Sequence, residues 1–157
     1  MPVYNGAVFL KEAISSILDQ SFTDFELIIL NDGSTDDSER IILSFKDDRI
    51  KYLKNAKNLG LIGTLNKGLS ESRGTYIARM DQDDISLPNR FQKQINFLKE
   101  HPNTTIVATK LSQINEKGED KGFWNDDFDT TTSEQIKFYM PCLLYTSHGL
   151  ARHDLSL

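Results

Sequence analysis

Two hydrophobic periodicities alternate along the chain, and this alternation is the feature that most restricts its fold. Short apolar runs such as Phe25–Leu30 are typical of buried strands. Between these runs, apolar residues recur every three or four positions, as they do over 10–18, which is typical of one face of a helix. Alternation of this kind predicts an α/β fold with a mainly parallel sheet and helices on both faces.

The expected order is strand then helix, four times over, followed by a fifth strand. Ser34 and Asp37 are expected to form a capping box that begins the second helix. Ile62, Leu65 and Leu69 are expected to face inward on the third helix. Strands are expected over 25–30, 50–53, 75–80 and 105–114. Helices are expected over 10–18, after Ser34, over 61–72, from Pro88 to about His101 and over 131–139. A turn is expected over Glu116–Gly118.

The length and the absence of repeats or linkers predict a single domain over residues 1–157. Its first strand is unusual, because only Met1–Val3 precede the polar turn Tyr4–Gly6. A buried parallel strand commonly has about five or six residues. Either the sheet lacks most of one strand, or the chain begins inside a longer gene product.

Composition excludes several classes of protein. The net charge of −5 argues against a nucleic-acid partner, which usually requires a basic surface. Cys142 is the single cysteine, so no internal disulfide is expected. The N-terminal residues do not form a signal-peptide pattern, and no apolar run approaches the ~18 residues of a membrane span. A phosphate-bearing ligand remains compatible with the charge if a cation mediates its binding.

The acidic run Asp81–Asp84 follows a predicted strand and carries the strongest chemical signal. Its three carboxylates repel one another, and two of them ~4 Å apart would cost roughly 4 kcal/mol at an effective dielectric near 20. Alternate residues at a strand end point the same way, so Asp81 and Asp83 are expected to face one site. Mg²⁺ or Mn²⁺ would suit these oxygen ligands. The alternative is a solvated acidic turn that caps the next helix.

Polar residues also follow the other strands, and the carboxyl ends of parallel strands meet at one edge of a sheet. Asp32 lies in an Asn-Asp-Gly-Ser sequence that is also good turn chemistry. Tyr4 is suited either to stack on a base or to pack against the protein. Arg79 lies inside a buried strand pattern and needs a partner, which is either a carboxylate of the acidic run or a ligand phosphate.

Four stretches resemble the family 2 glycosyltransferases, which have the fold called GT-A. They are MPVYNG, SILDQSFTDFELIILNDGSTDDS, NLGLIGTLNKGL and GTYIARMDQDDISLPNRFQKQINFLKEHP, and together they cover roughly residues 1–102. Each motif is weak alone, but four in this order and spacing are specific. The resemblance implies metal-dependent transfer of a sugar, with inversion, from a nucleotide-diphosphate donor to the hydroxyl of a sugar or lipid-linked acceptor.

The resemblance also implies residue roles. Pro2, Tyr4 and Asn5 would hold the nucleotide and Asp32 would read its base. Asn58 and Gly60, with the third helix, would wall the nucleotide pocket. Asp81 and Asp83 match the DxD motif, which contacts the ribose and a diphosphate bound to Mg²⁺ or Mn²⁺. By the same analogy, the protein would act in the cytoplasm, at the inner face of the membrane, on a surface polysaccharide or lipid-linked acceptor.

The match ends before the catalytic base, which in the family is an acidic residue of the later, acceptor-binding half. Asp126, Asp127 and Asp129 form an acidic loop whose context does not fit, so no base is assigned. Residues 142–157 also depart from the expected pattern and are interpreted as a doubtful tail of an incomplete GT-A domain.

Two alternatives to an active transferase remain open. The first is a nucleotide-sugar-binding module without turnover, which assays of transfer and donor hydrolysis separate from an active transferase. The second is a different class of enzyme. A nucleotidyltransferase on a related sheet would need a glycine-rich, basic loop for a triphosphate. The turn at Tyr4–Ala7 has one glycine and no nearby arginine, which argues against that class.

Overall fold

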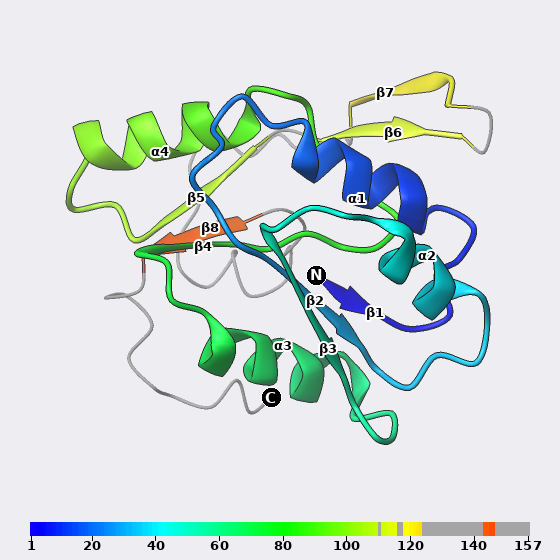
Figure 1. Cartoon of the computed structure of the whole chain (residues 1–157). Coiled ribbons are helices and arrows are strands. Elements are labelled where there is room, and N and C mark those ends of the chain that lie inside the picture. The colour runs from blue at the N-terminus through cyan, green and yellow to red at the C-terminus, as the bar shows by residue number, and fades with distance from the viewer. Residues whose placement is uncertain (110, 116–117, 124–142, 147–157) are drawn as a thin grey trace.

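The computed structural model describes residues 1–109, 111–115, 118–123 and 143–146. Its centre is a parallel sheet in the order β1-β2-β3, made of β1 (Pro2–Val3), β2 (Leu27–Asn31) and β3 (Ile50–Lys54). In Figure 1 this sheet lies between the pair α1 (Leu10–Leu18) and α2 (Ser38–Ser44) on one side and α3 (Gly60–Glu71) on the other. The predicted α/β arrangement, with a parallel sheet and helices on both faces, is therefore present.

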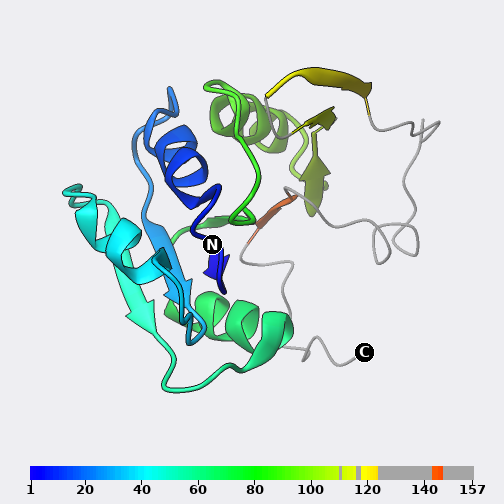
Figure 2. The same ribbon diagram turned by 90° about the vertical axis from the view of Figure 1, so that its right-hand side faces the viewer.

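A second group of strands lies beside the parallel sheet (Figure 2). β8 (Leu143–Thr146) lies between β4 (Tyr76–Ala78) and β5 (Ile106–Ala108) and is antiparallel to both. α4 (Arg90–Glu100) connects β4 to β5, and a separate hairpin joins β6 (Ser112–Ile114) to β7 (Asp120–Phe123). The sequence did not predict this antiparallel part, because β8 lies in the stretch interpreted as a doubtful tail.

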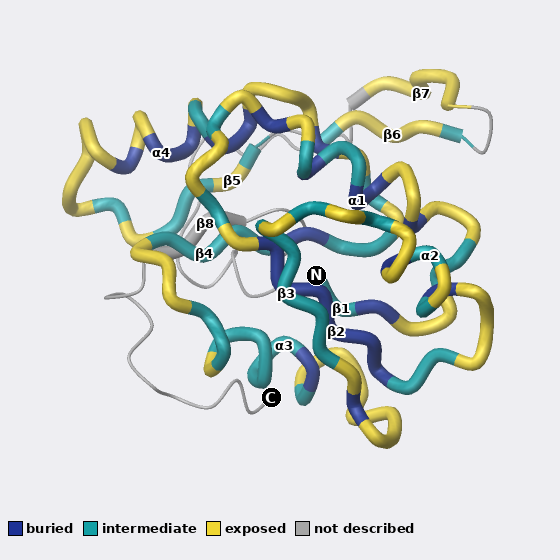
Figure 3. The backbone as a smooth tube through the Cα atoms, viewed as in Figure 1, coloured by how far each residue is buried: buried dark blue, intermediate teal, exposed yellow. Residues whose placement is uncertain are grey.

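Buried residues of β1, α1, β2, α2 and α4, together with Met80, form the hydrophobic core. In Figure 3 the buried parts of α1 and β2 are dark blue. Every residue of β2 is buried, as its uninterrupted apolar pattern indicates. Phe91 of α4 closes the core by packing edge-on against Phe25, with ring centroids 5.6 Å apart. The buried members of the core are Val3, Leu10, Ile14, Ile17, Leu27, Ile29, Ile42, Met80 and Phe91.

Several local expectations were wrong. The Ser34–Asp37 capping box does not form: α2 begins at Ser38 with Asp37 at its N-cap, and the Ser34 hydroxyl instead accepts a hydrogen bond from the Asn5 N–H at 3.1 Å. Ile62 is 48% exposed rather than buried, because α3 turns Thr64 inward. The strand expected over 105–114 is divided between β5 and β6. The helix expected over 131–139 lies outside the described residues.

An apolar cleft of about 740 Å³ separates the parallel sheet from the β4 layer. Its walls come from β2, α3, β4 and α4, and it reaches Met1 at the start of the two-residue strand β1. The Met1 amino group donates a hydrogen bond to the Ile28 carbonyl at 2.8 Å. β2 and β4 thus face each other across a space that no strand fills among the described residues.

Candidate functional site

The carboxyl ends of β1 and β2, the start of α3 and the acidic run meet around one pocket of about 340 Å³, which we call the edge pocket. It gathers seven of the eight residues that the sequence singled out for ligand binding, although they are spread over about eighty positions of the chain. The lining residues are Pro2, Val3, Tyr4, Asp32, Asn58, Gly60, Leu61, Thr64, Arg79, Asp81, Gln82 and Asp83.

Asp32 is placed at the back of the edge pocket by the sheet itself. Its N–H extends the β1–β2 ladder by donating to the Val3 carbonyl at 2.7 Å, and the residue is only 3% exposed. Its Oδ1 accepts hydrogen bonds from Asn55 Nδ2 and from the Leu59 N–H, both at 2.8 Å. Burial raises the pKa of the carboxyl, but hydrogen bonds from Leu59, Asn55, Thr64 and Gly60 outweigh it and hold the pKa below its usual value. Asp32 is therefore an ionised hydrogen-bond acceptor at neutral pH.

The turn after Asp32 requires glycine. Gly33 has a φ of +76°, and a Cβ there would lie 3.2 Å from the Asn58 backbone nitrogen. This close approach lets the loop after β3 bring the Leu59 N–H to Asp32 and places Asn58 at the rim of the pocket. The Asn-Asp-Gly-Ser sequence thus forms a turn, and Asp32 of this turn lines the edge pocket.

The acidic run divides into two different carboxylates. Asp81 forms an ion pair with Arg79, with Nη2 and Oδ2 2.8 Å apart, and both side chains are largely buried. Burial raises the pKa of Asp81, the Arg79 charge opposes this rise, and Asp84 and Asp83 add to it. Asp83 is exposed at the mouth of the pocket. The expectation that Arg79 finds a carboxylate of the acidic run is confirmed.

Gln82 is a site residue that the sequence analysis missed. Its Oε1 accepts from the Tyr4 N–H at 2.9 Å, and its Nε2 donates to the Tyr4 carbonyl at 3.2 Å. These two hydrogen bonds fasten the acidic run to the first turn and hold Tyr4, whose side chain is 47% exposed, at the rim. The available signal was that Gln82 lies between Asp81 and Asp83 in the sequence. Alternation along a strand, which places Asp81 and Asp83 on one face, would place Gln82 on the opposite face.

Asn5 is the predicted site residue that does not line the edge pocket. It has a φ of +49°, and its Oδ1 accepts a hydrogen bond from the Thr35 N–H at 2.8 Å. Together with the bond from Asn5 N–H to Ser34, this contact joins the first turn to the loop before α2. In this structure Asn5 shapes the pocket from outside. Leu61 and Thr64 are further lining residues that the sequence analysis did not name.

Asp81 and Asp83 fit a divalent cation that shares its coordination with a ligand. Within the described part of the chain, no three His, Cys, Asp or Glu side chains are gathered into a complete metal site. Mg²⁺ and Mn²⁺ are commonly bound through one or two carboxylates plus substrate phosphates and water. Asp81 is a half-buried carboxylate whose pKa is raised, and a cation would stabilise its charged form beside the other acidic groups. The chemistry of this pair thus suits a cation that arrives with a phosphate-bearing ligand.

Comparison with known proteins extends these observations. The glycosyl transferase family 2 model matches residues 1–154. The putative glycosyltransferase EpsE of Bacillus subtilis is 42% identical over 121 residues, which are 75% of this chain and 44% of EpsE. No helix among the described residues combines the length and apolar character needed to cross a bilayer.

Two examples represent the solved structures that share the fold. TarS of S. aureus (residues 1–349), in complex with UDP, superimposes with a TM-score of 0.80 at 22% identity, covering 98% of this chain and 47% of that one. The mannosyltransferase PcManGT from Pyrobaculum calidifontis, in complex with GDP-Man and Mn²⁺, gives a TM-score of 0.63 at 19% identity over 71% of this chain and 34% of that one. The predicted GT-A fold is confirmed. The chain spans less than half the length of each of these three proteins, and it belongs to glycosyl transferase family 2.

Proposed function

We propose that this chain binds the nucleotide-sugar donor of a metal-dependent glycosyltransferase in the edge pocket. The observation that supports the proposal best is the convergence of Asp32, Asp81 and Asp83, from two distant loops, on one pocket that Tyr4 and Asn58 also line. The solved relatives in complex with UDP and with GDP-Man and Mn²⁺ support the same class of ligand.

The pocket has two chemically different ends. Tyr4, Asp32 and Asn58 offer an aromatic face, a buried acceptor and an amide, which suit a base and its ribose. Asp81 and Asp83 would hold Mg²⁺ or Mn²⁺ at the other end, with Arg79 close enough to Asp81 to balance its charge. A cation bound there would stabilise the negative charge that develops on the departing diphosphate.

The proposed reaction is an inverting displacement at the anomeric carbon of the donor sugar. The bond from that carbon to the diphosphate oxygen breaks, and a bond to the acceptor oxygen forms on the opposite face. The nucleoside diphosphate leaves with the electron pair, and the acceptor hydroxyl gives its proton to a base. The acidic loop 126–129, to which no such role is assigned, lies outside the described residues. The acceptor proposed is a sugar or a lipid-linked sugar.

Calorimetry tests donor binding and the metal requirement together. UDP titrated into the chain with Mn²⁺ or Mg²⁺ should bind, and the same titration with EDTA should show at least a tenfold loss of affinity. Equal affinity in EDTA would overturn the metal role, and no binding under any condition would overturn the donor site.

Turnover is tested separately from binding. Release of UDP from a UDP-sugar, measured with and without an acceptor mixture of sugars and lipid-linked sugars, should increase when the acceptor is present. Donor binding without release would instead identify a nucleotide-sugar-binding module.

A further inference from the structure

The first turn of the chain is held in place by side chains from two distant segments. Four consecutive backbone N–H groups, those of residues 4–7, each donate to such a side chain. The Tyr4 N–H binds Gln82 of the acidic run at 2.9 Å. The other three bind the segment that leads into α2, where the acceptors are the side chains of Ser34, Ser38 and Asp36. The turn is thus fixed to the β2–α2 connection on one side and to the acidic run, through Gln82, on the other.

The amide of Gln82 pairs with the backbone of Tyr4 as another peptide group would. It offers one carbonyl oxygen and one NH₂ group. Oε1 accepts from the Tyr4 N–H, and Nε2 donates to the Tyr4 carbonyl at 3.2 Å. The reversed amide would place oxygen against oxygen and NH₂ against N–H, and both contacts would be repulsive. The backbone of Tyr4 therefore fixes the orientation of the Gln82 side chain.

Gly6 provides the space in which this amide lies. A Cβ added at Gly6 would overlap Oε1 of Gln82 and would lie 2.5 Å from its Cδ and 2.9 Å from its Nε2. Alanine at this position would therefore displace the amide and break its two hydrogen bonds. The φ of Gly6 lies outside the left-handed region, so its backbone conformation is open to alanine. The need for glycine in the first turn thus comes from the glutamine of the acidic run.

We propose that Gln82 is a positioning residue that sets the spacing between the first turn and the acidic run to the length of a nucleoside diphosphate. Gln82 is bonded covalently to Asp81 and Asp83, and both groups of its amide bind Tyr4. This inference rests on the proposed function, in which the nucleoside lies beside Tyr4 and the cation-bound diphosphate beside the two carboxylates. A ligand that reaches both ends gains affinity from their fixed spacing, whereas a ligand that reaches one end does not.

The two halves of the ligand test this role. In calorimetry with Mg²⁺, Gln82→Ala and Gln82→Met should each lower the affinity for UDP at least about tenfold, because the two ends of the pocket are no longer held at one spacing. The affinities for uridine and for pyrophosphate with Mg²⁺, measured by NMR titration, should stay within about twofold of those of the unmodified chain, since each half contacts one end. Gln82→Met keeps the length of the side chain, so it separates the loss of the hydrogen bonds from the loss of packing.

Gly6→Ala disturbs the same contact from the other loop. It should lower the affinity for UDP to the same extent as Gln82→Ala. The double variant should bind UDP within about twofold of either single variant, because one contact can be lost only once. Additive losses would show that the two residues act independently and would overturn the positioning role.

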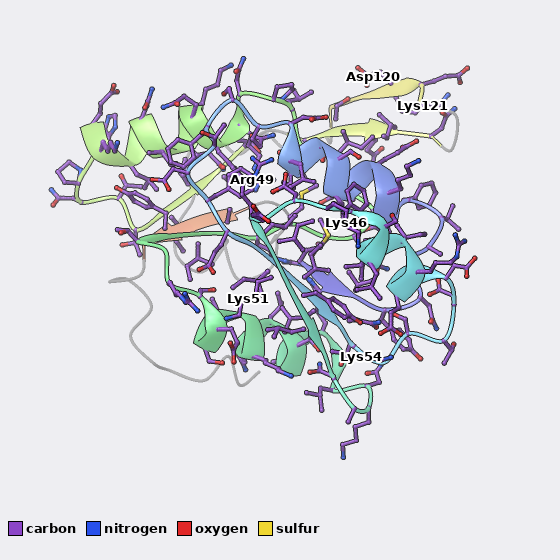
Figure 4. The ribbon with its side chains drawn as sticks, in the orientation of Figure 1. Lys46, Arg49, Lys51, Lys54, Asp120 and Lys121 are labelled. Carbon is purple, nitrogen blue, oxygen red and sulfur yellow. The ribbon has the colours of Figure 1, made fainter. Side chains whose placement is uncertain are left out.

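Lys51→Met is the matched control. Lys51 of β3, labelled in Figure 4, bonds to the Glu71 carboxylate of α3 at 2.7 Å, and neither residue lines the edge pocket. The substitution removes a side-chain contact between two elements and should leave the affinity for UDP unchanged. Unchanged UDP binding in the Gln82 variants, or an equal loss of UDP, uridine and pyrophosphate binding, would overturn the positioning role alone. Failure of the unmodified chain to bind UDP would overturn the proposed function and this inference with it.

Discussion

At the scale of single residues, the two carboxylates of the DxD motif differ more than the motif suggests. Asp81 is half-buried and paired with Arg79, whereas Asp83 is exposed at the mouth of the edge pocket. The sequence predicted that both residues face one site, because three neighbouring carboxylates after a predicted strand repel one another unless a cation binds them. The two hydrogen bonds between the Gln82 side chain and the backbone of Tyr4 could not be predicted, because they depend on where two distant loops meet.

Asp83→Asn should separate metal binding from folding. The substitution removes a charge at an exposed position, so the free energy of unfolding should change by less than about 0.5 kcal/mol. Affinity for UDP in the presence of Mn²⁺ should fall at least tenfold, which corresponds to about 1.4 kcal/mol, because the cation loses an anionic ligand. Asp84→Asn is the matched control, since Asp84 belongs to the same run but does not line the edge pocket. Equal effects of the two substitutions on binding would contradict a specific role for Asp83.

At the scale of helices, strands and turns, local patterns predicted what is local. α1, α3 and α4 lie close to their expected positions because helical periodicity is carried by the segment itself. The start of α2 was wrong because the Ser34 hydroxyl binds the distant Asn5 N–H instead of its own helix. The rotation of α3 was wrong for a similar reason: Thr64 turns inward to accept a hydrogen bond from buried Asn55. Strand partners such as β8 depend on residues far along the chain, which no local pattern reports.

The turn at Gly33 gives a test of how the site is built. In Gly33→Ala, the backbone keeps its left-handed conformation at a cost of roughly 1–2 kcal/mol, and the new Cβ crowds the Asn58 backbone nitrogen. We therefore expect destabilisation of about 2–3 kcal/mol in urea unfolding and weaker UDP binding. Gly118 is the control, because it has a φ of +78° with open space around a Cβ, so Gly118→Ala should cost only the conformational part. If both variants lose the same stability, the contact with the Asn58 loop does not restrict this turn.

At the scale of the whole molecule, the apolar cleft between the parallel sheet and β4 departs from a closed core. A strand continued backward from Pro2 in the β1 register would run beside Ile29, Ile28 and Leu27 of β2. It would lie between β2 and β4 and bury apolar side chains in a space of about 740 Å³. The same position now holds the Met1 amino group, whose pKa burial lowers from 8.0 to about 5; Asp81 opposes this shift and Arg79 adds to it.

The buried amino group makes stability depend on pH. Its folded-state pKa lies below its unfolded value, so the unfolded chain binds more protons between pH 5 and 8. The contribution of this group to stability is therefore fully present above pH 8 and is lost as the pH falls toward 5. Three pH units correspond to about 4 kcal/mol at most. Urea unfolding measured at pH 8 and pH 5.5 should show this loss, and equal stability at the two values would contradict it.

An N-terminal extension combines both arguments in one experiment. Ile-Val-Ile-Val placed before Met1 should raise the melting temperature at pH 8 by at least about 5 °C, because even two buried aliphatic side chains contribute about 3 kcal/mol. It should also weaken the pH dependence, since a peptide N–H replaces the ammonium. Gly-Ser-Gly-Ser at the same place should weaken the pH dependence without the rise in melting temperature, because it has no apolar side chains to bury. If the two extensions raise the melting temperature equally, removal of the charge alone stabilises the fold and the cleft does not accept a strand.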